Sequence, residues 1–294
     1  MELAISTYSL ARWRRENKKT LEQSLDWIAG AGVTAVEFAG LDDKPATNPL
    51  RRAAALRRRC EKLGLKIAGY CVGAELLVPP EAQAKAVEQL ERHVDIAVAL
   101  GAPSMRHDIT RGPVKSNGKT PTLAQVIKRV VDAILQVTDY AEARGVLTSL
   151  ENHGFYMQPS RTVERLILAV DHPNFGVTLD MGNFLCVNEN PVEAVRRLAK
   201  YAVMAHAKDF HVRPRKSMPS TGWFATPTPI ALRGAIVGHG VIDIPAQLRA
   251  LKRAGYDGFL SLEFEGIEEP TAALRLGIDY LRQQFTAAGF ECAT

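Results

Sequence analysis

The chain has few cysteines and no long apolar run, and both absences narrow its class. Its four cysteines form no CxxC pair, which predicts reduced thiols rather than a disulfide framework or a zinc ribbon. No apolar segment approaches membrane-spanning length, and the N-terminus shows no charged leader before an apolar core. We therefore expect a cytoplasmic protein that has no membrane partner.

The sequence also lacks the motifs of several large functional classes. GxGxxG, P-loop and nucleophile-elbow patterns are absent, so nucleotide and acyl chemistry have no support. The net charge is +5, and part of it lies in an arginine-rich cluster at residues 51–59 where apolar residues keep helical spacing. Because no aromatic residues interleave with this charge, we expect a solvated helix face and no nucleic-acid partner.

What the chain does contain is a regular alternation of short apolar segments with amphipathic stretches. The predicted strands span residues 2–8, 33–38, 65–72, 102–107, 146–151, 176–180, 202–207 and 258–263. The predicted helices lie near residues 20–30, 50–63, 81–100, 120–144, 160–170, 191–200, 244–254 and 270–288. The strands are apolar throughout, as expected where both faces of a sheet are covered. Eight such units in 294 residues predict an α/β fold with a single (β/α)8 TIM-barrel domain over residues 1–294.

Two longer segments, 108–119 and 210–242, interrupt this rhythm. Long loops in a compact domain are commonly functional, and the loops that follow barrel strands form the active-site face. We expect residues 210–242 to be an active-site lid loop. In it, Trp223 would shield the substrate and Arg233 would offer a cation to it.

Four potential metal ligands end four successive predicted strands: Glu151, Asp180, His206 and Glu263. A parallel barrel gathers strand ends at one mouth, where these side chains would meet around one ion. Carboxylates with one imidazole suit Mn²⁺, Mg²⁺ or Co²⁺, and Zn²⁺ stays open. A single acidic residue after a strand is typical of a solvated loop or a helix cap. Four in succession predict a metal site and an enzyme.

The motifs around these residues resemble the xylose-isomerase-like TIM-barrel superfamily, also called sugar phosphate isomerases/epimerases. The resemblance covers nearly the whole chain and is densest in SLENH at 149–153, LDMGN at 179–183, HAKD at 206–209 and GYDGFLSLE at 255–263. It implies that the four residues bind one divalent ion, with Mn²⁺ favoured, and that Glu151 and Glu263 lie on opposite sides of the substrate. It also implies a small-molecule sugar or polyol substrate and leaves a homo-oligomer open, because such barrels often pair.

These residue types suit proton removal from a carbon beside a carbonyl. Glu151 or Glu263 would be the base, and the metal would stabilise the enediolate as a Lewis acid. Proton return to the other face is epimerisation, return to the neighbouring carbon is isomerisation, and loss of a β-hydroxyl is dehydration. We predict a metal-dependent isomerase or epimerase of a sugar or keto-polyol, in carbohydrate metabolism, acting through a metal-bound enediolate. The alternative is a lyase, a dehydratase of a keto-polyol or a dehydroshikimate-like acid.

His153 and Lys208 each follow a predicted ligand by two residues and are candidate catalytic acid–base groups. They resemble the E-x-H and H-x-K pairs of the dehydroshikimate dehydratase branch of the superfamily. Ketose 3-epimerases carry His where Asn183 stands and Glu where Met157 stands. These departures count against a plain ketohexose 3-epimerase.

Further residues at predicted strand ends are candidates for substrate binding: Arg106, His107 and Tyr70. Glu37 also ends a predicted strand, and the sequence favours a solvated carboxylate there. Glu265 is either exposed or a partner that orients a metal ligand.

Two other function classes remain as rivals. One is an assembly subunit that binds metal and sugar without turning substrate over. The other is an endonuclease-IV-like repair enzyme, for which the chain offers too few histidines in its first half.

Overall fold

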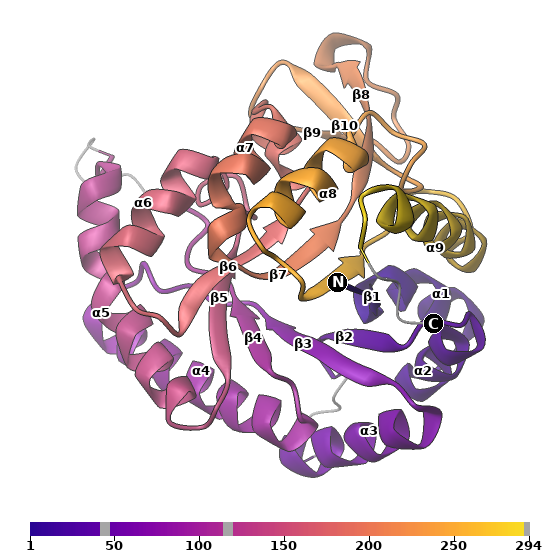
Figure 1. Ribbon diagram of the computed structural model, residues 1–294. Coiled ribbons are helices and arrows are strands. Elements are labelled where there is room, and N and C mark those ends of the chain that lie inside the picture. The colour runs from indigo at the N-terminus through magenta and orange to yellow at the C-terminus, as the bar shows by residue number, and fades with distance from the viewer. Residues whose placement is uncertain (42–47, 114–119, 291–294) are drawn as a thin grey trace.

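The computed structural model describes residues 1–41, 48–113 and 120–290 and shows a closed parallel barrel surrounded by helices (Figure 1). The barrel order is β1-β11-β7-β6-β5-β4-β3-β2. Its strands are β1 (Glu2–Ser6), β2 (Ala35–Ala39), β3 (Lys66–Val72), β4 (Ser104–His107), β5 (Leu147–Glu151), β6 (Phe175–Asp180), β7 (Ala202–Ala207) and β11 (Phe259–Leu262). The predicted single TIM barrel is thus confirmed. Cys292 and residues 114–119 of the first predicted long segment lie outside the described residues.

Every predicted helix is present, with its bounds within three residues of the prediction. The helices are α1 (Ala11–Asn17), α2 (Leu21–Gly30), α3 (Pro49–Leu63), α4 (Pro80–Leu100), α5 (Leu123–Glu142), α6 (Ser160–Val170), α7 (Pro191–Leu198), α8 (Ile244–Arg253) and α9 (Pro270–Ala287). Short 3₁₀ turns η1 (Thr7–Leu10), η2 (Asn183–Val187), η3 (Ala199–Tyr201) and η4 (Arg215–Ser217) complete the set. Helix α1 was not predicted. No helix in the described part of the chain is long and apolar enough to cross a bilayer.

Local sequence explains where the helices begin and end, as α3 illustrates. The Asn48 side chain accepts hydrogen bonds from the amides of Leu50 and Arg51, both at 3.1 Å, and Pro49 occupies the first helical position. Gly64 ends the helix in the left-handed conformation, with φ +68°. Strong caps let the sequence place such boundaries closely.

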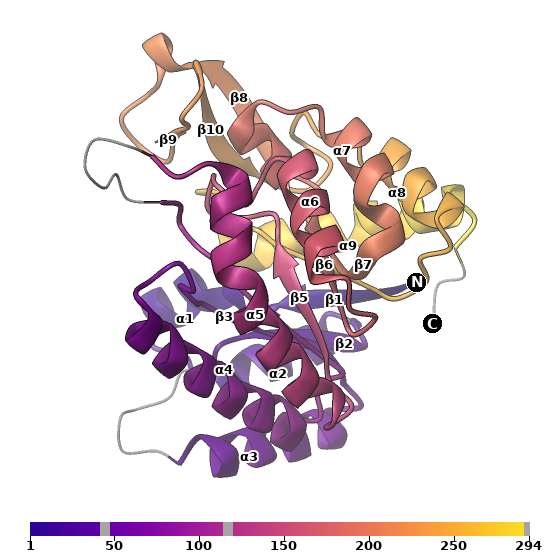
Figure 2. The same cartoon turned by 90° about the vertical axis from the view of Figure 1, so that its left-hand side faces the viewer.

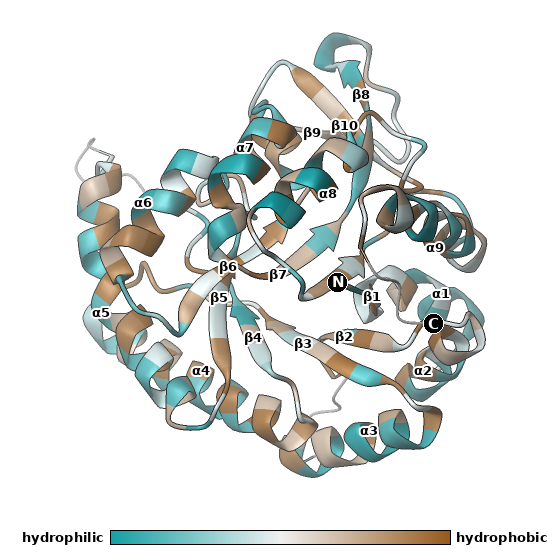
Figure 3. Cartoon of the chain, viewed as in Figure 1, coloured by the Kyte–Doolittle hydropathy of each residue, from teal (hydrophilic) through white to brown (hydrophobic). Residues whose placement is uncertain are grey.

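The helices turn apolar faces inward against the barrel (Figure 3). In α5, Val126, Val130, Ile134 and Val137 are fully buried and recur at helical spacing. All six residues of β6 are buried, because helices cover its outer face and the barrel interior covers the other. The core therefore holds the strand ends rigidly.

Residues 210–242 differ from the predicted loop, because they contain an antiparallel sheet. Its strands are β8 (Asp209–Pro214), β9 (Phe224–Ala225) and β10 (Ile230–Ala235), in the order β8-β10-β9. Phe210 and Leu232 are fully buried, whereas the side chain of Arg213 is exposed. Polar residues alternate with apolar ones in β8, and β9 has only two residues, so the segment shows no continuous apolar run like those of the barrel strands. The sheet leaves the barrel directly after β7 and stands beside its mouth (Figure 2).

Candidate metal centre and active site

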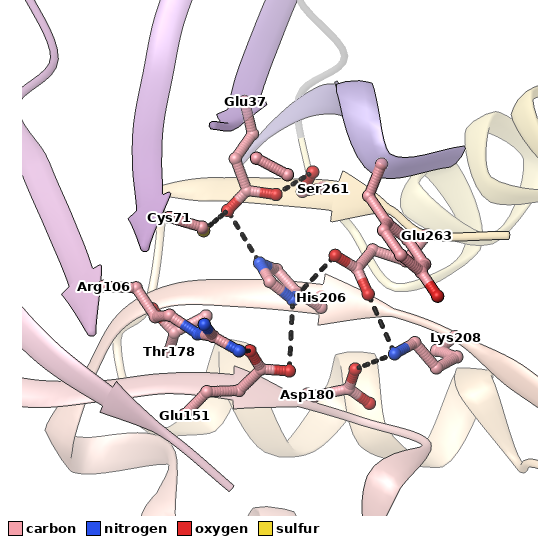
Figure 4. Close-up of polar contacts among 12 residues, drawn as sticks. Glu37, Cys71, Arg106, Glu151, Thr178, Asp180, His206, Lys208, Ser261 and Glu263 are labelled. Atoms are coloured by element: carbon pink, nitrogen blue, oxygen red, sulfur yellow. Dashed lines mark hydrogen bonds and ion pairs between the residues drawn. The ribbon is translucent and has the colours of Figure 1, made fainter. Parts of the chain in front are cut away.

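The four predicted metal ligands meet at the carboxyl ends of the barrel strands (Figure 4). Glu151 and Asp180 end β5 and β6, His206 lies in β7, and Glu263 follows β11. One ligand atom from each lies within 4.8 Å of the corresponding atoms of the others, and all four residues are buried. Asp180 and His206 are register partners across β6 and β7. The structure therefore brings together every residue of the predicted ligand set.

Two buried atoms of this set have no hydrogen-bond partner among the described residues: His206 Nδ1 and Asp180 Oδ2. The His206 nitrogen lies 3.7 Å from Glu151 Oε1 and 3.5 Å from Glu263 Oε1. Leaving buried polar atoms without a hydrogen bond is costly, so each such atom needs an explanation. Converging carboxylate oxygens and an imidazole nitrogen are ligands that a divalent cation accepts. The donor set thus fits one divalent ion.

The backbone after β6 holds Asp180 in place. Its Oδ1 accepts hydrogen bonds from the amides of Gly182 and Asn183, both at 2.8 Å. The Asn152 side chain bridges to the Asp180 backbone, accepting from its amide at 2.8 Å and donating to its carbonyl at 2.9 Å. A Cβ on Gly182 would lie only 2.8 Å from the Lys208 carbonyl oxygen, so this turn requires glycine. These bonds leave Oδ2 directed toward the other ligands.

Two cations, Arg106 and Lys208, lie against the ligand carboxylates. Arg106 Nε donates to Glu151 Oε2 at 2.6 Å. Lys208 Nζ lies 2.8 Å from Glu263 Oε2 and 3.1 Å from Asp180 Oδ2. Both residues were predicted at the site, and the structure places both there.

These contacts set the charge of the site. Burial raises the pKa of Glu151, but Arg106 and His206 lower it by more than burial raises it. The resulting pKa lies well below the usual value for a glutamate. Burial raises the pKa of Asp180 above its usual value although Lys208 acts against it. Burial lowers the pKa of Lys208, yet Asp180 and Glu263 hold it well above the ordinary lysine value. The ammonium group therefore compensates part of the carboxylate charge.

A cavity of about 540 Å³ opens onto these ligands and is lined by Tyr70, Arg106, His153 and Lys208, among others. An adjoining hollow of about 300 Å³ shares His153 and Lys208 with it. His153 Nδ1 lies 3.4 Å from Asp108 Oδ1, and this carboxylate raises the pKa of His153 above the usual value. The hydroxyl of Tyr70 lies 3.1 Å from His93 Nδ1. The predicted positions of Tyr70, Arg106, His153 and Lys208 at the cavity agree with the structure.

A larger hollow of about 720 Å³ lies at the opposite end of the barrel, at residues that begin strands, such as Leu147 and Ala202. It shares no residue with the ligand cluster. Size alone therefore does not identify the site, whereas the convergence of charged side chains does.

His107 does not line either cavity at the ligands, contrary to the prediction. Its fully buried ring packs against the Phe175 ring, with centroids 6.3 Å apart. Neighbouring residues of a strand point to opposite sides, so Arg106 facing the barrel interior directs His107 toward the outer layer. Burial accordingly lowers the pKa of His107.

Trp223, which precedes β9, and Arg233, within β10, lie together but are not among the residues that line these cavities. The Arg233 guanidinium carbon lies 5.7 Å from the centroid of a Trp223 ring, and its Nη2 lies 3.4 Å from Glu268 Oε1. Their neighbours Gly222, Phe224 and Gly234 do line the smaller hollow.

Sequence reasoning missed the role of Glu37, which is buried rather than solvated. Burial raises the pKa of Glu37, but the adjacent His206 lowers it below the usual value. An acidic residue between Val36 and Phe38 in an apolar strand was the available signal. Asn183 was read only as a departure from epimerases, and its Nδ2 donates to Glu151 Oε1 at 3.1 Å.

Comparison with known proteins agrees with this geometry. A family model described as xylose isomerase-like TIM barrel matches residues 25–284. The rhizopine catabolism protein MocC of Rhizobium meliloti is 27% identical over 292 residues, covering 93% of this chain and 84% of that protein. The inosose dehydratase of Geobacillus thermodenitrificans (strain NG80-2) is 22% identical over 262 residues, covering 86% and 84%. A solved structure of L-ribulose 3-epimerase shares the fold, with TM-score 0.74, 19% identity and coverage of 98% and 95%.

Proposed function

The chain belongs to the xylose isomerase-like TIM barrel family, and we propose that it is a metal-dependent isomerase or epimerase of a sugar or keto-polyol. The observation that carries the proposal is the placement of Glu151 and Glu263. Their carboxylates face His206 Nδ1 at 3.7 Å and 3.5 Å and lie on either side of it (Figure 4). Two carboxylates flanking one centre suit proton removal and proton return at different positions of a substrate.

Glu151, Asp180, His206 and Glu263 would hold the divalent ion, for which we propose Mn²⁺. Once bound, the ion would supply Lewis acidity toward the carbonyl oxygen of the substrate.

The contacts of the two glutamates divide the proton transfers between them. Arg106 holds the pKa of Glu151 well below the usual value, which makes this carboxylate a weak base and its protonated form a strong acid. In this proposal Glu263 takes the proton from carbon and later releases it to solvent, and Glu151 takes a proton from solvent and delivers it to the other side of the substrate. Lys208, 2.8 Å from Glu263, remains charged and orients that carboxylate.

A dehydratase is the second candidate, because His153 offers a separate acid at the cavity. Asp108 raises the pKa of His153, which favours the protonated imidazole that a leaving hydroxyl group needs. The similarity to an inosose dehydratase supports the same alternative.

We also propose that residues 210–242 act as a lid. The support is that Phe224 and Gly234, from β9 and β10, line the hollow that joins the main cavity. In this proposal Trp223 and Arg233 stabilise the sheet through their mutual contact and contact the substrate only when the sheet moves inward.

Product mass in D₂O tests the proposed reaction directly. The purified chain with Mn²⁺ would be incubated with a panel of ketoses and keto-polyols and analysed by mass spectrometry. An isomerase or epimerase gives a product with the same composition as the substrate, except that one carbon-bound hydrogen is replaced by deuterium from the solvent. A dehydratase gives a product that has lost one water. Glu263→Gln and chelation by EDTA should each stop turnover. Turnover that continues after either change would contradict the proposal.

A further inference from the structure

Glu37 is a buried carboxylate beside the site that the proposed reaction does not use. It is 1% exposed, and its Oε1 lies 2.7 Å from His206 Nε2. Its Oε2 accepts a hydrogen bond from Ser261 Oγ at 2.9 Å, and its Oε1 accepts one from Cys71 Sγ at 3.2 Å. Burying a carboxylate is costly unless its oxygens accept hydrogen bonds. The partners of Glu37 therefore offset the cost of burying it.

The backbone around Glu37 is shaped to direct it inward. The β2–β3 register shifts between Val36 and Glu37, and such bulges re-aim a side chain. Across the ladder stands Gly69, where a Cβ would lie 3.2 Å from Ser104 Oγ. A larger residue at position 69 would therefore crowd the space beside the carboxylate.

Partners on other strands fix the geometry of the contact. Ser261 of β11 and His206 of β7 are register partners, so the two donors to Glu37 stand side by side (Figure 4). Both Glu37 oxygens already accept from a hydroxyl or a thiol. The imidazole Nε2 must then carry the proton of the 2.7 Å contact, which leaves Nδ1 to face Glu151 and Glu263.

We propose that Glu37 is a positioning residue that fixes the ring orientation and tautomer of His206, so that Nδ1 is presented to the divalent cation. This inference rests on the proposed function for the cation, and it adds a residue outside the four ligands. A carboxylate on the distal N–H of a ligand histidine orients the ring and increases its basicity. Without Glu37, the ring would be free to turn and would bind the ion more weakly.

Calorimetric titration of Mn²⁺ into ion-depleted protein tests the effect on binding. Glu37→Gln keeps the shape but loses the charge, and we expect its dissociation constant to rise about 10- to 100-fold. The matched control is Glu189→Gln, a carboxylate held by Ser160 and Arg197 away from the cavity, which should bind as the wild type does. Equal affinity of Glu37→Gln and wild type, with unchanged circular dichroism, would overturn the proposal. So would a second ion per chain that disappears in Glu37→Gln, because Glu37 would then be a ligand itself.

Crystal structures of ion-free wild type and Glu37→Leu supply a readout independent of metal. We expect the His206 ring to turn or shift in Glu37→Leu, and Glu37→Gln serves if that variant does not fold. A ring in the same orientation in wild type and variant would overturn the positioning role. Should wild type bind no Mn²⁺, the proposed function fails, while this comparison still decides what Glu37 does.

Discussion

At the residue scale, the site combines carboxylates that would repel one another with cations that hold them. Arg106 and Lys208 are both buried or nearly so, and each contacts a carboxylate of the ligand set. In a low-dielectric interior, the net stabilisation from such an ion pair is small, but removing one partner leaves a buried charge uncompensated and destabilises the protein. Two substitutions test whether the cations have this role.

Arg106→Met leaves Glu151 buried without its charged partner. We expect the free energy of unfolding to fall by about 3–5 kcal/mol and activity to fall with it. Arg144→Met is the control, because its pair with Asp95 is partly exposed and such pairs contribute about 1 kcal/mol or less. Urea denaturation of both variants measures the difference. An equal decrease in the free energy of unfolding for the two variants would show that the buried Arg106 pair contributes no more to stability than the exposed Arg144 pair.

Lys208→Met removes the ammonium group between Asp180 and Glu263. Without a divalent ion, the two carboxylates then lack a countercharge, and the melting temperature should fall sharply. A bound ion replaces that countercharge, so with Mn²⁺ present the difference from wild type should shrink. Calorimetric melting in EDTA and in Mn²⁺ gives both numbers. A deficit of the same size in both buffers would count against a cation site beside Lys208.

The predicted ligands and the missed Glu37 show what sequence reveals about single residues. Glu151, Asp180, His206 and Glu263 could be predicted because each lies at or next to the carboxyl end of an apolar strand, and parallel strands end on one face. The partners of Glu37 lie 34, 169 and 224 residues away, in Cys71, His206 and Ser261. Its burial depends on those contacts, which no local pattern contains.

At the element scale, the predictable features were those with strong local signals. Apolar runs marked the barrel strands, and glycine or proline marked helix ends such as Gly64 and Pro191. In the sheet of β8, β9 and β10, β8 (DFHVRP) alternates polar and apolar residues and β9 has two residues, so neither contains an apolar run; β10 (IALRGA) is mostly apolar but was included in the predicted loop. Strand burial in that segment arises from packing against the rest of the molecule.

The Asp209 side chain holds the segment that follows β10. Removing this side chain should make the backbone of residues 238–242 more mobile. Its carboxylate accepts hydrogen bonds from the amides of Gly238, Gly240 and Ile242 at 3.0, 2.8 and 3.1 Å. In Asp209→Ala we expect these three amides to exchange with D₂O faster than in wild type, while β6 keeps its protection. Hydrogen exchange with mass spectrometry resolves the two regions. Unchanged exchange near residue 240 would mean that Asp209 does not anchor the sheet.

At the scale of the whole molecule, closure of the barrel brings residues from distant parts of the sequence together at one site. Glu37 on β2 and Glu263 after β11 belong to opposite ends of the chain, yet β1 alone separates their strands in the barrel. The rigid ladder then holds buried charges at distances that a flexible chain would not keep. A divalent cation at their centre would account for the convergence of these carboxylate oxygens on His206 Nδ1, a buried atom without a hydrogen bond among the described residues.

Anomalous diffraction from a crystal soaked in Mn²⁺ tests that explanation most directly. The account predicts one strong anomalous peak bounded by Glu151 and Glu263 oxygens, Asp180 Oδ2 and His206 Nδ1, and no such peak in Asp180→Asn crystals. An absent peak, or a peak elsewhere in the barrel, would contradict it.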